Sequence, residues 1–177
     1  MRLLVITLLT FTAAAVAQEN PISTSVKWEY ELGRGVIVRA AEKMPETEYG
    51  FRATPDVRKF GEIVGHVADS AYVFCSSAKG EKNPSDGNVE KSKTSKADLV
   101  QALKDAFTYC DAVYAGMTDT IAAQTVKFGG RDVAKLGVLA FNNMHDYEHY
   151  GNMVTYMRLK NIVPPSSEPR TPPAAKK

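Results

Sequence analysis

Four stretches of the sequence place apolar residues at the spacing of one helix face, and long polar segments separate these stretches. Hydrophobic residues make up 44% of the chain and charged residues 24%, which is ordinary for a globular protein. We therefore predict an all-α fold, an antiparallel four-helix bundle with long loops, and another all-α arrangement is the alternative. The predicted helices cover residues 23–43, 57–79, 95–116 and 131–160.

The segments between these helices carry turn signals. Residues 80–94 are polar and contain Gly, Pro and Asn-Pro, so we expect a surface loop there. Residues 126–128, followed by Gly129 and Gly130, indicate a short extended piece and a turn. Residues 164–177 hold five of the nine prolines in the chain. This composition predicts a disordered Pro-rich C-terminal tail.

The N-terminus has the composition of a secretory signal peptide. Residues 1–17 carry a positive charge at Arg2, continue with an uncharged apolar run and end in Ala-Val-Ala, a typical cleavage signal. We therefore expect export to the periplasm or the exterior, with a single bundle domain over residues 18–163. No later apolar stretch approaches 18 residues, so the mature chain is expected to have no membrane span.

The charge distribution argues against a nucleic-acid partner. The chain has 22 Lys and Arg against 20 Asp and Glu, with a formal net charge of +2. Basic and acidic residues are interspersed, whereas nucleic-acid-binding proteins usually carry a basic stripe. We therefore expect no nucleic-acid partner.

The chain has two cysteines, Cys75 and Cys110, which are too few for a disulfide scaffold. One alternative is a disulfide between the second and third helices, which export would permit and which would contribute about 3–4 kcal/mol. The other alternative is two buried thiols that pack as small apolar groups. The hydrophobic core must support the fold in either case. The aromatic residues expected in that core include Trp28, Phe51, Phe107, Phe128 and Tyr150.

The chain has three histidines, and all of them lie on the apolar faces of predicted helices. His145 and His149 are four residues apart, which places them one turn apart on one face of the last helix. His66 lies on the inward face of the second helix. A divalent metal would satisfy three such imidazoles, and three protein ligands would leave an open coordination position. The alternative is a hydrogen-bonded core pair without a metal.

Two stretches resemble the DinB family of bacterial four-helix-bundle metalloproteins, which are related to mycothiol- and bacillithiol-dependent transferases. The first, FRATPDVRKFGEIVGHVADS, contains His66, and the second, MHDYEHYGNMVTYMRLKNIVPP, contains His145 and His149. The resemblance covers roughly residues 23–163. It implies a four-helix bundle in which these three histidines hold a divalent metal, most often zinc or nickel.

An open metal position suggests a metal-dependent thiol S-transferase or a related hydrolase, acting on a small-molecule substrate that the sequence does not identify. Asp69 and Glu62 lie one turn from His66 and are the candidate catalytic carboxylates. A metallopeptidase is disfavoured, because the zincin motif needs Glu after its first histidine, where this chain has Asp146. Asp146 and Glu148 are instead expected on a solvated helix face.

The non-enzymatic alternative is a metal-stabilised bundle that binds a small ligand or a protein partner. A cleft beside the metal would favour the transferase, and a site closed over the ion would favour the structural role. A homodimer formed through a helix face also remains open.

Overall fold

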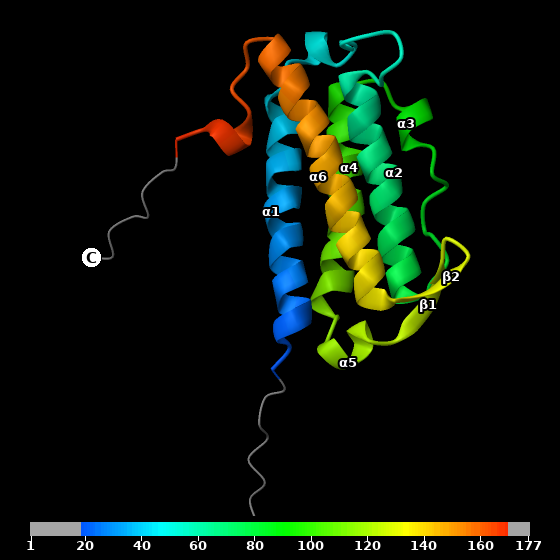
Figure 1. Ribbon diagram of the computed structural model, residues 1–177. Helices are drawn as coiled ribbons and strands as arrows, with labels where there is room; N and C mark the ends of the chain where they lie inside the picture. The colour runs from blue at the N-terminus through cyan, green and yellow to red at the C-terminus, as the bar shows by residue number, and fades with distance from the viewer. Residues whose placement is uncertain (1–18, 170–177) are drawn as a thin grey trace, which may run out of the picture.

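The computed structural model describes residues 19–169, and the predicted signal peptide lies outside these residues. Four long helices form a bundle, as the sequence predicts, with short elements at its ends and along one side (Figure 1). The helices are α1 (Pro21–Lys43), α2 (Phe60–Lys79), α3 (Val89–Ser92), α4 (Lys96–Ala115), α5 (Asp119–Ala122) and α6 (Lys135–Leu159). The remaining elements are strands β1 (Thr125–Phe128) and β2 (Arg131–Ala134) and the 3-10 turns η1 (Glu46–Glu48) and η2 (Pro165–Ser167).

The bundle is only partly antiparallel. α1 and α4 are antiparallel, because an ion pair of 2.6 Å joins Glu42 to Lys104 at one end and Ser23 Oγ donates to Asp119 at the other. The segment of residues 80–95 returns along the side of the bundle before α4 begins (Figure 1). α2 and α4 therefore run in the same direction, as do α1 and α6, and α2 and α6 are antiparallel.

Two helices begin later than the sequence predicts. α2 starts at Phe60 rather than at residue 57, because the backbone N–H groups of Phe60 and Gly61 donate to the carbonyls of Phe51 and Tyr49 in the preceding loop. α6 starts at Lys135 rather than at residue 131, because β2 pairs with β1 in an antiparallel hairpin. The predicted extended piece and Gly-Gly turn are therefore confirmed.

The start of the C-terminal tail is packed against the bundle, which differs from the expected disorder. Pro165 is buried, and the backbone N–H of Ser166 donates to the Tyr150 hydroxyl at 2.9 Å. Lys43 Nζ contacts a Glu168 carboxylate oxygen at 2.5 Å. Residues 170–177 lie outside the described residues.

Buried side chains from all four long helices form one continuous core. Cys75 and Cys110 are fully buried in it and form a disulfide between α2 and α4, so the disulfide alternative is the one observed. Trp28, which we expected in the core, is 60% exposed on α1.

Within residues 19–169, no helix combines the length and apolar character that crossing a membrane requires.

Gly65 marks the place where α3 packs against α2. A Cβ atom at this position would lie 2.6 Å from Cα and 2.9 Å from the backbone nitrogen of Glu90. These distances are shorter than any normal carbon contact, so only glycine allows the two backbones to approach this closely. The short α3 is therefore held directly over the turn of α2 that precedes His66.

We expect Gly65→Ala to displace α3 and to destabilise the protein by about 1–3 kcal/mol through overpacking. The matched control is Gly151→Ala in α6, where an added Cβ would meet nothing within 4 Å. That change should stabilise the helix by roughly 0.5–1 kcal/mol. Chemical denaturation of both variants measures the difference, and equal stability of the two would contradict the close approach.

Candidate metal centre

The three histidines converge, although 79 residues separate His66 from His145 along the chain. His66 extends from α2 and the other two extend from α6. The Nε2 atom of His145 lies 3.1 Å from Nε2 of His66 and 3.1 Å from Nε2 of His149. All three ligand atoms lie within 4.8 Å of one another. The structure therefore brings together the three residues that the sequence predicts as ligands.

Glu90 determines which nitrogen of His66 faces the centre. Its Oε2 atom lies 3.2 Å from His66 Nδ1, and an ionised carboxylate only accepts hydrogen bonds. Nδ1 must therefore carry the proton, which leaves a lone pair on Nε2. This lone pair points at the other two histidines and is suited to a metal, because zinc binds imidazole nitrogens at about 2.0–2.1 Å.

The environment keeps the imidazoles neutral. Burial, together with the neighbouring His66 and Arg58, lowers the pKa of His145 to about 4. Burial also lowers the pKa of His149 to about 3, with contributions from His145 and His66. The pKa of His66 is lowered as well, by burial and by the charge of Arg58. Neutral imidazoles at pH 7 are the form that binds a metal.

The two predicted carboxylates do not contact the histidines. Asp69 accepts the backbone N–H groups of Val89 and Glu90, both at 3.0 Å, and so holds the N-terminus of α3. Glu62 accepts the backbone N–H of Lys59 at 2.7 Å at the start of α2. Asp69 therefore positions the segment that carries Glu90, whereas Glu62 stabilises the helix end.

Sequence reasoning missed Glu90, because this residue lies in the polar segment that we expected to be a surface loop. The one relevant signal is Gly65, a glycine on the buried face of a helix next to His66. It indicates that another backbone comes close, but the sequence does not show which segment approaches.

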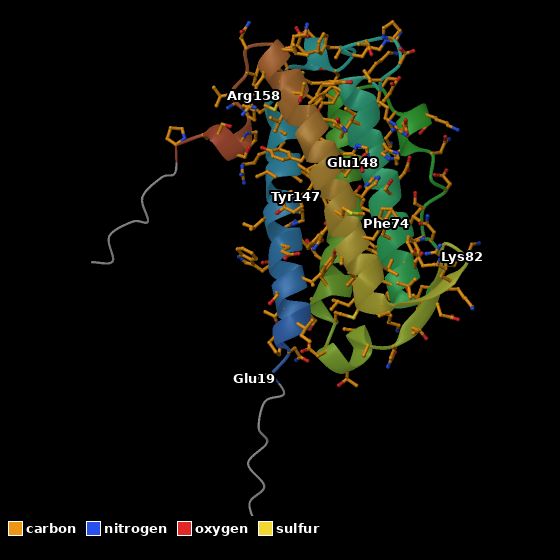
Figure 2. All side chains as sticks on the ribbon, viewed as in Figure 1. Glu19, Phe74, Lys82, Tyr147, Glu148 and Arg158 are labelled. Carbon is orange, nitrogen blue, oxygen red and sulfur yellow. A yellow bond between two sulfur atoms is a disulfide. The ribbon has the colours of Figure 1, made fainter. Side chains whose placement is uncertain are left out.

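Aromatic side chains pack against the side of the site that is nearest the β-hairpin. The ring of Phe74 lies 5.2 Å from that of His145 and 5.2 Å from that of Phe141, and Phe128 of β1 packs on Phe141 at 5.7 Å. Figure 2 shows Phe74 on α2 beside α6. The buried ring of Phe74 therefore covers His145 on this side.

The other side of the site opens into a cleft of about 670 Å³. His149 reaches the cleft directly, and Glu90 and Arg58 form part of its wall. Glu148, which the sequence places on a solvated helix face, is exposed and lines this cleft. Figure 2 labels this residue on α6. The cleft therefore gives small molecules a route to the site at His149.

Asp146 is not on a solvated helix face, and that expectation is wrong. Its side chain is 1% exposed, and burial raises the pKa of its carboxyl well above the usual value. It accepts a hydrogen bond of 3.3 Å from Asn142 in the interior. The residue after His145 therefore faces away from the cleft, which agrees with the failure of the zincin motif.

The model of the DinB superfamily matches residues 29–153. The chain belongs to the DinB superfamily. This assignment agrees with the resemblance seen in the two histidine-containing stretches.

Solved structures share the fold at low sequence identity. A DinB-like protein from Bacillus cereus is 17% identical, with a TM-score of 0.71, over 80% of this chain and 95% of that protein. A DinB-like protein from Bacillus subtilis is 20% identical, with a TM-score of 0.67, over 83% of this chain and 99% of that protein. A mycothiol-dependent maleylpyruvate isomerase is 17% identical, with a TM-score of 0.57, over 76% of this chain and 60% of the isomerase. No curated protein matches the chain.

We expect Glu90→Gln to weaken divalent-metal binding by about 10–100-fold, because the neutral amide no longer fixes the proton on His66 Nδ1. The matched control is Glu62→Gln, which removes the same charge one turn before His66 without touching a histidine. Competition with a chromogenic chelator measures both affinities. Equal affinities for the two variants would show that Glu90 does not support the centre.

Proposed function

We propose that this DinB-superfamily protein is a divalent-metal-dependent thiol S-transferase, with zinc or nickel held by His66, His145 and His149. The observation that carries the proposal is the convergence of three Nε2 atoms beside an open cleft. Three imidazole ligands with one accessible side are typical of a catalytic metal site, whereas a structural site is closed by a fourth protein ligand. Cys75 and Cys110 are joined to each other, so neither supplies that ligand.

The residues of the chain have distinct parts in this chemistry. A bound divalent ion lowers the pKa of a thiol or a water molecule and so provides a nucleophile at neutral pH. Glu90 keeps the proton on His66 Nδ1 and balances part of the positive charge. Phe74 covers His145 on one side, while the cleft admits the thiol and the electrophile. With water in place of the thiol, the same site would support a related hydrolase.

The thiol is supported by the structural neighbours. One of them is named as a mycothiol-dependent isomerase. Its fold matches 76% of the length of the present chain. The identity of 17% supports the fold alone, so the use of a thiol by this chain is part of our proposal.

We also propose that the protein is exported. The signal-like residues 1–17 and the buried disulfide both suit an oxidising compartment. N-terminal sequencing of the protein purified from its native cells should then give Gln18 as the first residue. A chain that still begins with Met1 would contradict export. Two further statements stay predictions. The first is that the protein has no nucleic-acid partner, and the second is that it forms a homodimer through a helix face.

Metal analysis and a conjugation assay test the transferase. Protein purified without an affinity tag should carry about one divalent ion per chain, and His66→Ala and His145→Ala should lose it. Met144→Ala is the control, because it truncates an exposed neighbour of His145. Conjugation of a low-molecular-weight thiol to a chromogenic electrophile should stop when a chelator removes the metal.

The outcomes separate the alternatives. Conjugation that continues without metal would overturn the transferase. Stoichiometric metal without conjugation or hydrolysis would favour the non-enzymatic, metal-stabilised bundle.

A further inference from the structure

Arg58 is fixed at the entrance to α2, beside the metal centre. The Tyr156 hydroxyl donates to the carbonyl oxygen of Arg58 at 2.7 Å, which ties this loop residue to α6. Nε of the guanidinium donates to Glu90 Oε1 at 2.8 Å. The same carboxylate contacts His66 through its other oxygen. Arg58 is therefore held by its backbone and by one edge of its guanidinium.

The other edge of the guanidinium faces away from Glu90. Within residues 19–169, no hydrogen bond involves Nη1 or Nη2 of Arg58. The side chain is 42% exposed and lines the same cleft as His149 and Asn152. A guanidinium presents its donors in a planar fork that matches the two oxygens of a carboxylate. The cleft therefore contains an available anion-binding group.

The position of this charge does not serve the metal itself. The guanidinium of Arg58 and the imidazole of His66 contact the two oxygens of the same Glu90 carboxylate, so the positive charge lies next to the centre. This charge repels a divalent cation, and it faces a cleft through which an anion can approach both Arg58 and His149. Arg58 is thus placed to favour a negatively charged molecule in the cleft.

We propose that Arg58 binds the carboxylate group of the molecule that enters this cleft, and that it determines specificity for small carboxylic acids. The inference rests on the proposed function, since it names the substrate class of the same site. A carboxylate is favoured over a phosphate because Glu148 and Asp56 also line the cleft and repel a doubly charged group more strongly.

Calorimetric titration with benzoate tests the proposal, with inorganic phosphate as the second probe. Zinc-loaded and metal-free protein are both titrated, for the wild type, Arg58→Gln and Arg58→Lys. We expect Arg58→Gln to lose benzoate affinity by about 10–100-fold, since a charge-assisted hydrogen bond contributes about 1.5–3 kcal/mol. Arg58→Lys should be intermediate, because it keeps the charge and loses the fork.

The control is Lys59→Gln, which removes the same charge from the adjacent residue. Lys59 pairs with Glu62 at 3.5 Å and does not line the cleft. The benzoate affinity of the Lys59→Gln variant should stay within about twofold of that of the wild type. Thermal unfolding of each variant confirms that the fold is retained.

Zinc affinity, measured by chelator competition, distinguishes anion binding from mere support of Glu90. If Arg58 binds the anion, Arg58→Gln should keep or increase zinc affinity, because a repulsive charge is removed. If Arg58 only holds Glu90, the variant should lose zinc affinity and keep benzoate affinity, and the proposal is overturned. Phosphate that binds as tightly as benzoate, or wild type that binds no benzoate, also overturns it.

If the proposed metal-dependent function is wrong, the titrations give a result that differs from those above. Wild-type protein that takes up no zinc would refute the metal site, and the metal-free titrations would then decide the role of Arg58. A loss of benzoate affinity on changing Arg58 to Gln would still support the carboxylate site, and unchanged affinity would refute it.

Discussion

The contact between Glu90 and His66 is the interaction on which the rest of the site depends. It decides which nitrogen of His66 is free, and so whether three lone pairs or only two can meet at one point. The carboxylate reaches the imidazole only because α3 lies against α2 at Gly65 and is held there by Asp69. The four-residue helix α3, in the polar crossover segment of residues 80–95, thus supplies the carboxylate that contacts His66.

The orientation of α6 depends on polar contacts behind the site. Tyr114 donates to Asn143 at 2.7 Å, and Asn143 donates to the carbonyl of Val26 at 2.9 Å. Tyr114 also stacks on Tyr30 of α1, with ring centroids 3.9 Å apart. Buried hydrogen bonds of this kind are directional, whereas apolar packing tolerates rotation. They hold one face of α6 toward α1 and α4, and the face that carries His145 and His149 consequently faces α2.

The sequence was sufficient for the features that depend on helical periodicity. The four long helices and the inward position of each histidine follow from residues repeated every three or four positions, and the set of three ligands follows from the resemblance to the DinB family. Glu90 could not be found in this way, because its role comes from a tertiary contact of a non-periodic segment. Asp146 was misplaced for a related reason, since a carboxylate is normally excluded from the interior, and here burial stabilises its protonated form, while Asn142 supplies a hydrogen-bond donor to one of its oxygens. Trp28 shows the reverse case, an apolar residue that the local pattern cannot distinguish from the core.

The disulfide between Cys75 and Cys110 closes a covalent ring that contains the whole crossover and therefore Glu90. The exposed part of this crossover is where a protease would be expected to cut. A single cut there would open the ring without separating its two ends, because the sulfur bridge would still join α2 to α4. A nicked molecule would thus keep α2 and α4 covalently joined within the assembled bundle.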